Sequence, residues 1–411
     1  MHTSQPLIRT LAITGIALLA LTACSAKGAT ATTSSEPDAV KTGAGIVGDT
    51  ISLGVVSDYS GPFSPLATAA LDGIQTFWDQ QNGDGGVCGT YQVELVVRDH
   101  ASNAQQSAAM YQEIGQDVLA YQDYSGAAQI GAILPDLEAD GRLMLANSAT
   151  KQLIDSPLIL IPAAFIGTDA QISLSWLLDS GTLQKGDTFA TIHQETDFGE
   201  QANEGADEFA DEHGLTALSY QIKPTDTDMT AAVTDAIANG AQVIVAGVAP
   251  GQTASIATVL QSAGSDIPIA GVYSSFVPAL LDTPAAGYLT EHMTLSSYIA
   301  TFEAGPGAEL YATLSAEEEA PVTANAVQGY LSATLMSSIL EAACAAGDLT
   351  PEGVAAQRFE LGPTDFDGHK VTFDYSNVGE SPTNEAFIVH PDAAVDGGLS
   401  TISDGPFTLS K

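Results

Sequence analysis

The stretch Thr50-Ile-Ser-Leu-Gly-Val-Val56 is a short run of β-branched and apolar residues, and Gln92-Val-Glu-Leu-Val-Val-Arg98 is a second run of the same kind. Between them, apolar residues recur at helical spacing from Ala67 to Gln81, and the glycine-rich turn Asn82–Gly86 follows. Strand, helix, glycine-rich turn and strand in this order predict a βαβ unit. Repeated units of this kind form parallel sheets covered by helices, so we expect an α/β fold.

The same alternation continues along the chain. Helical patterns at Asn103–Ile114 and Ala127–Ala139 alternate with strand patterns at Val118–Tyr121 and Arg142–Leu145. A second series follows Pro162, with predicted strands at Thr188–His193, Gln242–Gly247 and Ile269–Val272. About 360 residues follow Gly48, more than one hydrophobic core usually organises, so we expect two lobes.

The last third of the chain departs from this alternation. A long helix is predicted from Thr323 to Ala346, and short strands are predicted at Val371–Phe373 and Ala386–His390. We expect the helix to return to the first lobe and the strands to complete the second, so that the hinge contains more than one crossing. The predicted division is lobe I from 49–166 and 298–366, and lobe II from 167–297 and 367–411.

The first residues have the pattern of a secretory signal. Arg9 precedes an apolar run from Leu11 to Ala23, which is shorter than the roughly 20 residues that a membrane-spanning helix needs. Residues 1–23 are therefore predicted to be a signal peptide. Cys24 after Leu21-Thr-Ala23 resembles the lipobox of bacterial lipoproteins, in which this thiol carries diacylglycerol. We expect an extracytoplasmic bacterial protein anchored to the cell membrane by lipid at Cys24. An ordinary signal peptide with an incidental cysteine is the alternative.

Residues 24–48 are rich in Ser, Thr, Ala and Gly. Such a composition buries too little apolar surface to offset the entropy of ordering, so we predict a flexible linker. The linker contains Gly43-Ala-Gly-Ile-Val-Gly48, which has the spacing of a dinucleotide fingerprint. That motif requires a strand before it and a helix after it. Because it precedes the first predicted strand, we interpret it as part of the linker.

The remaining chemistry-bearing residues point to binding and not to catalysis. With Cys24 lipidated, Cys88 and Cys344 are an even pair in an oxidising compartment, which favours a disulfide over two buried free thiols. Fifty acidic and eleven basic residues give a net charge of −39, which excludes nucleic acid as an expected partner. Nucleophile-elbow, zincin, P-loop and C-x-x-C motifs are absent from the sequence, and its histidines are scattered. We therefore expect no enzyme activity, no cofactor and no metal.

The sequence contains several short motifs in this order: Gly54-Val-Val, Ser60-Gly-Pro62, Asp72-Gly73, Gly85-Gly-Val-Cys-Gly89, Val96-Val-Arg-Asp99, Ser148-Ala-Thr150, Thr196-Asp-Phe-Gly199, Asp226–Val233, Phe366-Asp-Gly368 and Val371-Thr-Phe-Asp374. Their order and spacing resemble those of periplasmic binding proteins of the branched-chain amino acid type. The resemblance covers roughly 49–390. It implies two Rossmann-like lobes of the type I class, joined by a three-strand hinge, that close on a small molecule and deliver it to an ABC transporter permease. We expect a monomer. A ligand-sensing receptor lobe with the same fold is the alternative.

The resemblance also implies the ligand-binding residues. Ser125, aligned with a one-residue gap, together with Ser148 and Thr150, corresponds to the residues that hold the carboxylate and amine of the ligand. Phe198, which stands before Gly199, corresponds to an aromatic residue that covers it. The alternative roles are helix N-caps for the hydroxyls and core packing for Phe198.

Three positions depart from the amino-acid-binding pattern. Leu66 stands where an aromatic residue is expected, Val248 or Ala249 where a tyrosine is expected, and Tyr273 where an acidic residue would pair with the α-ammonium. A buried ammonium without a carboxylate is costly. Either Asp58, Asp123 or Asp197 replaces the acid from another loop, or the ligand is a neutral amide, a urea-like compound or an aromatic or aliphatic carboxylate. The pocket expected for such a ligand is lined by Tyr59, Phe63, Phe198, Tyr273 and Phe276.

Overall fold

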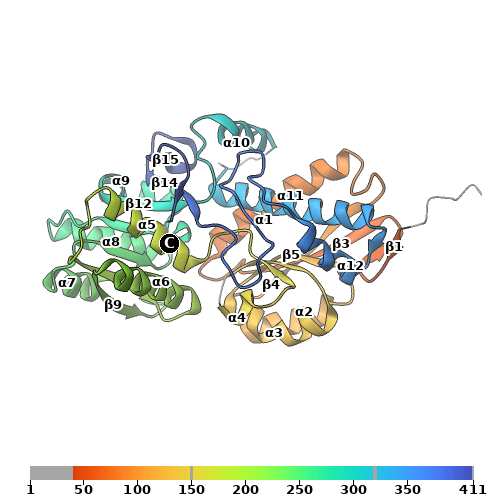
Figure 1. Cartoon of the computed structure of the whole chain (residues 1–411), viewed down its shortest axis with the longest axis horizontal. Coiled ribbons are helices and arrows are strands. Elements are labelled where there is room, and N and C mark those ends of the chain that lie inside the picture. The colour runs from red at the N-terminus through yellow and green to blue at the C-terminus, as the bar shows by residue number, and fades with distance from the viewer. Residues whose placement is uncertain (1–39, 149–150, 318–321, 410–411) are drawn as a thin grey trace, which may run out of the picture. The chain divides into compact units, whose positions relative to one another are not determined.

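The computed structural model describes residues 40–148, 151–317 and 322–409. Its described part contains two sheets that are mainly parallel and carry helices on their faces (Figure 1). The predicted α/β class is confirmed. The predicted signal peptide, Cys24 and Thr150 lie outside the described residues.

Five parallel strands form the core of the first sheet, and a short antiparallel strand, β2 (Ile46–Val47), pairs with one of them. In spatial order these five are β4 (Gln92–Asp99), β3 (Thr50–Ser57), β5 (Ala120–Ser125), β6 (Met144–Asn147) and β7 (Ile159–Leu160). The predicted βαβ unit is confirmed. β3 and β4 pair in parallel from Thr50 opposite Gln92 to Ser57 opposite Asp99. The helices that follow are α1 (Ser64–Gly83), α2 (Ala104–Ile114), α3 (Ala127–Asp140) and α4 (Lys151–Ile154).

The second sheet repeats the strand order of the first. Its parallel strands are, in spatial order, β9 (Thr216–Ile222), β8 (Thr188–Gln194), β10 (Ile244–Gly247), β11 (Ile269–Gly271) and β12 (Met293–Ser297). Three antiparallel strands extend it: β14 (Glu385–Pro391) beside β12, β15 (Leu399–Thr401) beside β14, and β16 (Phe407–Thr408), also on β14. The longer helices of this part are α5 (Ile166–Asp179), α6 (Asp197–His213), α7 (Thr230–Ala238), α8 (Pro250–Ser262) and α9 (Ala286–His292).

The long predicted helix is confirmed as α11 (Ala324–Ala345), with Thr323 as its N-cap. It packs against α1, and the two labelled helices lie side by side in Figure 1. Glycines make this close approach possible. A Cβ on Gly73 would lie 1.9 Å from the carbonyl oxygen of Ala326, and one on Gly329 would lie 1.9 Å from that of Ala70. Helix α11 therefore joins the core of the first sheet, as expected.

Three segments carry the chain between the two lobes and contact one another. The Lys370 ammonium donates to the Pro162 carbonyl at 2.9 Å, and the Val371 N–H donates to the Tyr298 carbonyl at 3.1 Å. These contacts bring together the segment after β7, the segment after β12 and the segment before β14. The predicted strand at Val371–Phe373 is wrong, because residues here form only isolated bridges, Lys370 with Ile299 and Phe373 with Thr364.

Part of the predicted linker is folded. β1 (Lys41–Thr42) pairs in parallel with β13 (Asp348–Leu349), and β2 pairs with β3. Gly45 has a φ of +81°, and a Cβ there would lie 2.0 Å from the backbone nitrogen of Leu119. The linker prediction is therefore wrong from Lys41 onward, since this segment pairs with strands and Gly45 serves close backbone approach.

The disulfide between Cys88 and Cys344 is confirmed, with the two Cα atoms 6.2 Å apart. It joins the turn between α1 and β4 to the last turn of α11. The Cys88 N–H also donates to the Glu341 carboxylate at 2.7 Å, so the turn is held to α11 by two different bonds.

Candidate functional site

The first sheet has its topological switch point between β3 and β5, because β4 lies on one side of this pair and β6 on the other. Open parallel sheets bind ligands beyond the carboxyl ends of the strands at such a point. The last residues of β3 and β5 are Ser57 and Ser125, and the Ser57 hydroxyl donates to Ser125 Oγ at 2.8 Å. The predicted residue Ser125 therefore lies at the switch point.

An irregularity in β5 produces this pairing. Gly54 pairs with Tyr121 and Val55 with Asp123, so Gln122 is an extra residue in β5. If β5 kept the register of Gly54 and Tyr121 without this irregularity, Tyr124 and not Ser125 would lie opposite Ser57. Gln122 is fully buried, and its carboxamide oxygen accepts from the Trp78 indole at 3.1 Å.

His100, directly after β4, completes the group around Ser125. Its Nδ1 accepts the Ser102 backbone N–H at 3.1 Å, so the ring hydrogen is on Nε2. Nε2 lies 3.0 Å from the Ser125 carbonyl and 3.2 Å from Ser125 Oγ, and donates to this residue. Burial lowers the pKa of His100, which keeps the imidazole neutral at pH 7. The site thus offers neutral donors at its centre.

Asp123 lies beneath Ser125 in the same strand and is 5% exposed. The Asn147 amide donates to its Oδ1 at 2.6 Å. Burial raises the pKa of Asp123 to about 7, although the bond from Asn147 favours the ionised form. No cation is among the groups that act on this carboxyl.

Asp58 shapes the loop that follows β3. Its carboxylate accepts the N–H groups of Gly61 at 2.7 Å and Phe63 at 3.2 Å, and the Ser102 hydroxyl at 2.7 Å. A Cβ on Gly61 would lie 2.3 Å from this carboxylate, so a larger residue would displace the Asp58 side chain. Tyr59 is held in the loop by its N–H, which donates to Asp99 at 3.0 Å. Its buried phenol oxygen has no protein partner, and burial, reinforced by Asp123 and Asp99, raises the pKa of Tyr59.

Ser148 follows β6 and contacts the start of α3. Its hydroxyl accepts the Gly126 N–H at 3.0 Å and donates to the Asn147 carbonyl at 2.6 Å. Gly126 has a φ of +87°, and no side chain caps the N-terminus of α3. The predicted residue Ser148 thus positions the loop beside Ser125, while the unpaired N–H groups of the first turn of α3 lie next to both.

The second sheet contributes Phe198 from the first turn of α6. Thr196 is the N-cap of this helix and accepts the Gly199 N–H at 3.3 Å. The Phe198 ring is half-buried and meets the Phe63 ring edge to face, with the centroids 6.2 Å apart. Phe63, which follows β3, and Phe198, which follows β8, therefore bring the two sheets' loops into contact. Phe198 also packs against the core of the second sheet, so the two roles considered for it coexist.

Three predicted residues lie deeper than expected. Val248 is fully buried among the apolar residues of the second sheet, which argues against its side chain as a ligand contact. Tyr273 is 8% exposed, its ring lies 4.4 Å from that of Tyr298, and its phenol oxygen has no protein partner. Phe276 is buried, like Val248, among the apolar residues of the second sheet.

Asp169 of α5 is a further acidic residue near Tyr273. Its Oδ2 accepts the Tyr273 N–H at 3.4 Å, and its Oδ1 has no hydrogen-bond partner. Burial raises the pKa of Asp169 to about 7. The side chain is 1% exposed, so it underlies Tyr273 and does not itself present a charge at the edge of the sheet.

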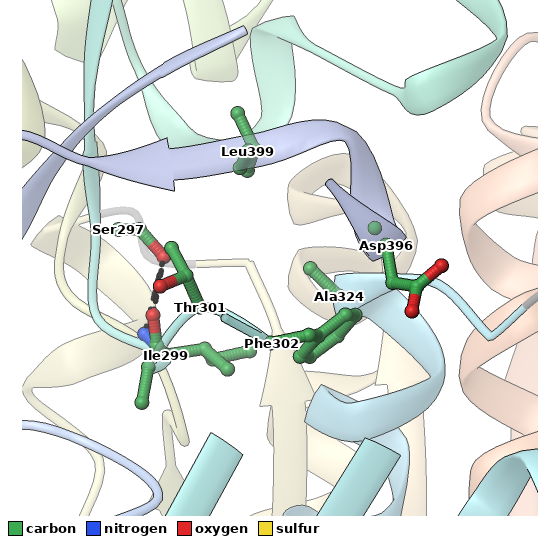
Figure 2. Close-up of a pocket in the computed structure, with 9 residues that line it drawn as sticks. Ser297, Ile299, Thr301, Phe302, Ala324, Asp396 and Leu399 are labelled. Carbon is green, nitrogen blue, oxygen red and sulfur yellow. Dashed lines mark hydrogen bonds between the residues drawn. The ribbon is translucent and has the colours of Figure 1, made fainter. Parts of the chain in front are cut away.

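A separate pocket lies beside the segment after β12 (Figure 2). It is lined by Ser297, Ile299, Ala300, Thr301, Phe302, Ala324, Asp396, Gly397 and Leu399. The Ser297 hydroxyl donates to the Ile299 carbonyl at 2.8 Å, and the Thr301 hydroxyl is bonded to Thr401. None of the predicted ligand-binding residues lines this pocket, and its hydroxyls are already paired.

Within residues 40–148, 151–317 and 322–409, no three His, Cys, Asp or Glu side chains are grouped so as to hold a metal ion. In the same part of the chain, no helix is both long and apolar enough to cross a membrane.

Two lobes with the same strand order, which present hydroxyl, amide and aromatic groups at the carboxyl ends of their strands, define the class of two-lobed solute-binding proteins. The chain belongs to the periplasmic binding protein family, because the family model described as "Periplasmic binding protein" matches residues 50–394. The predicted family and its two-lobed type I fold are confirmed. Members of this family are solute-binding proteins and not enzymes.

Three solved structures illustrate the similarity. A fatty acid ABC transporter substrate-binding protein from Thermomonospora curvata is 30% identical, with a TM-score of 0.86, over 90% of this chain and 96% of that chain. A branched-chain amino acid ABC transporter protein from Thermus thermophilus with bound valine is 17% identical, with a TM-score of 0.77, over 88% and 97%. A solute-binding protein from R. palustris in complex with 4-hydroxybenzoate is 20% identical, with a TM-score of 0.73, over 88% and 97%. A search of curated proteins found no match.

Sequence reasoning missed Ser57, His100 and Asn147. Each ends a strand of the first sheet or directly follows one. Polar residues at the last position of otherwise apolar strands are the signal that could have identified them, because those positions meet at one edge of the sheet.

Proposed function

We propose that the protein is the extracytoplasmic solute-binding component of an ABC importer and that its ligand is a small carboxylate without an ammonium group. The ligand would bind at the switch point of the first sheet and be covered by Phe198 from the second. Lipid at Cys24 would hold the protein, as a monomer, at the outer face of the cell membrane. Ser125 and Ser148 contact the ligand in this proposal, together with Tyr59 and the adjoining Thr150.

The observation that carries the proposal is the state of the acidic residues near the site. The Asp58 carboxylate is occupied by three donors, and Asp123 is buried with the Asn147 amide as its partner. Asp197 is exposed at the first turn of α6, and Tyr273 stands where the amino-acid-binding pattern has an acid. A desolvated ammonium without an ionised partner costs several kcal/mol, roughly enough to abolish binding.

A carboxylate, in contrast, meets suitable donors. It accepts hydrogen bonds only, and Ser125 lies beside the N-terminus of α3, whose first-turn N–H groups have no side-chain cap. The positive end of a helix dipole favours an anion by about 0.3–1 kcal/mol. The Phe63 and Phe198 rings supply an apolar cover for the rest of the ligand. The similarity to a fatty acid binding protein over nine tenths of the chain supports the same ligand class.

The test compares two ligands that differ only in the ammonium group. Calorimetry on the full chain is expected to show binding of 4-methylpentanoate and none of L-leucine at pH 7, and octanoate serves as a longer aliphatic acid. Ser125→Ala should weaken binding of 4-methylpentanoate at least tenfold, while Ser52→Ala, on the same sheet but away from the switch point, should leave it unchanged. Binding of L-leucine with equal or greater affinity would refute the proposal.

A further inference from the structure

We propose that Ser57 and His100 determine the ligand specificity of this site by making the Ser125 hydroxyl a hydrogen-bond donor only. The inference rests on the proposed function, in which Ser125 touches the ligand. It adds the reason why that contact selects an oxygen of the ligand over an N–H group. Both residues have a positioning role, since each acts through Ser125.

The ring nitrogens of His100 have fixed roles. The Ser102 backbone N–H donates to Nδ1 at 3.1 Å, so Nδ1 is an acceptor and the ring hydrogen is on Nε2. Nε2 lies 3.0 Å from the Ser125 carbonyl oxygen and 3.2 Å from Ser125 Oγ. One N–H group is therefore shared between two acceptors of the same residue. The Ser125 hydroxyl cannot donate to Nε2, because that nitrogen already carries a hydrogen.

A strained turn holds His100 in this orientation. Ala101 and Ser102, the two residues after it, have φ values of +47° and +56°, a region that residues with a Cβ seldom adopt. The turn brings the Ser102 N–H back onto the ring, and the Ser102 hydroxyl donates to the Asp58 carboxylate at 2.7 Å. His100 is 1% exposed, and its ring stacks on that of Tyr124 with the centroids 6.5 Å apart. Strain of this kind persists where the surrounding structure fixes it, often at a binding site.

Ser57 supplies the second donor. Its hydroxyl donates to Ser125 Oγ at 2.8 Å, and its side chain is 1% exposed. A serine hydroxyl has one hydrogen and two lone pairs. Ser125 Oγ accepts the hydrogen of Ser57 and shares that of His100, so its own hydrogen points away from both. The direction left is outward, because Ser125 is half-buried at the end of β5 whereas its two partners are buried.

This arrangement decides which ligand groups bind at Ser125. A carboxylate oxygen accepts the Ser125 hydrogen, because it offers lone pairs only. An ammonium or amide N–H meets a hydrogen that faces it and lone pairs that are already engaged. An unpaired buried donor is costly, so a site of this kind rejects such ligands by mismatch as well as by the lack of a charge partner.

The experiment compares an acid with its own amide. Calorimetry on the full chain at pH 7 gives the Kd of 4-methylpentanoate and of 4-methylpentanamide, in which an NH2 group replaces one carboxylate oxygen. The measured quantity is the ratio of the two Kd values, amide over acid. We expect a ratio above about ten for the wild-type protein, roughly the effect of one unpaired hydrogen-bonding group. A ratio near one or below overturns the inference.

Two variants separate the specificity role from a structural one. Ser57→Ala and His100→Leu each remove one donor to Ser125 Oγ, so a lone pair becomes available to the amide N–H. We expect the ratio to fall about tenfold in each variant. Loss of structure, in contrast, would weaken both ligands and leave the ratio unchanged. An unchanged ratio in either variant overturns the role of the residue replaced.

Two further variants serve as controls. His100→Gln carries an amide N–H that can take the place of the Nε2 hydrogen, so it should keep a ratio close to that of the wild type. Ser52→Ala, on the same strand as Ser57 but away from the switch point, should leave the ratio unchanged. A His100→Gln protein that behaves like His100→Leu would show that the ring and not its hydrogen is required, which overturns the donor role.

The tautomer of His100 provides a test without a ligand. An absence of heat with 4-methylpentanoate, octanoate and the amide overturns the proposed function, whereas the hydrogen-bond directions can still be measured. The nitrogen NMR resonances of the ring, assigned by their loss in His100→Leu, distinguish a protonated nitrogen from one with a lone pair. We expect the hydrogen on Nε2 at pH 8. A hydrogen on Nδ1 overturns the inference, because Nε2 would then accept the hydrogen of Ser125.

Discussion

Replacement of Lys370 by methionine is expected to stabilise the protein below pH 7. This lysine is 2% exposed where the three crossing segments meet, and burial lowers its pKa from an ordinary value near 10.5 to about 7. A shift of this size corresponds to about 5 kcal/mol of destabilisation while the lysine is protonated in the unfolded chain. Methionine has a similar length and no charge to desolvate.

The wild-type contacts recover part of this cost. The ammonium lies 4.9 Å from the centre of the Phe366 ring, 5.0 Å from Phe373 and 5.5 Å from Tyr298. Together with the bond to the Pro162 carbonyl, such contacts contribute roughly 2 kcal/mol. The Pro162 carbonyl keeps a second donor, the Gln328 amide at 2.7 Å, after the substitution. Lys370→Met is therefore expected to raise the free energy of unfolding by about 3 kcal/mol at pH 6.

Thermal unfolding at several pH values provides the assay. A chain of this length has an unfolding entropy of about 0.8 kcal/mol/K, so the gain amounts to about 4 °C at pH 6. A base whose folded pKa is lowered destabilises fully below that pKa, and the effect fades as the pH rises towards the unfolded value. The advantage of Lys370→Met should therefore shrink from pH 7 to pH 10. The exposed control Lys185→Met should show no such trend. A variant that is less stable than wild type at pH 6 would refute the reasoning.

Two further predictions concern the cysteines. Cys88→Ser combined with Cys344→Ser should lower the free energy of unfolding by about 3–5 kcal/mol, because the disulfide closes a long loop; thermal unfolding should then match that of the reduced wild-type protein, and an unchanged midpoint would contradict this. Cys24→Ser should move the protein expressed in bacteria from the detergent phase to the aqueous phase of a Triton X-114 partition, while Ser25→Ala should not; equal partitioning of the two variants would exclude the lipid anchor.

The sequence predicted best those elements whose burial pattern is regular. β3, β4 and α11 were found within a few residues, since their apolar side chains follow the period of a strand or a helix. β9 was missed, because this edge strand alternates between exposed and half-buried residues and contains few large apolar side chains. The strand proposed at Val371–Phe373 failed for another reason. Its apolar residues fill the junction between the lobes, where burial does not require a ladder.

The site was predictable only in part, because its contacts depend on register. Ser125 was identified through a family motif that needed a one-residue gap, and the structure has an extra residue, Gln122, in the same strand. That irregularity decides whether Ser125 or Tyr124 faces Ser57. No local pattern in the sequence reveals it, since Gln122 is held by Trp78 from a distant helix. The contacts of Ser57 and His100 with Ser125 follow from that register, so the sequence alone does not predict them.

The covalent bond between Cys88 and Cys344 also has a consequence for the order of events during secretion. The two thiols are 256 residues apart, and the strands of the second lobe from β8 to β12 lie between them. A chain that emerges amino end first exposes Cys88 early and Cys344 only after those strands have crossed the membrane. The disulfide of the first lobe therefore cannot form until the five parallel strands of the second lobe have crossed, whereas β14 to β16 follow later. Once the disulfide has formed, a protease cut between β8 and β12 leaves the molecule in one piece, since the ring closed by the disulfide contains that cut.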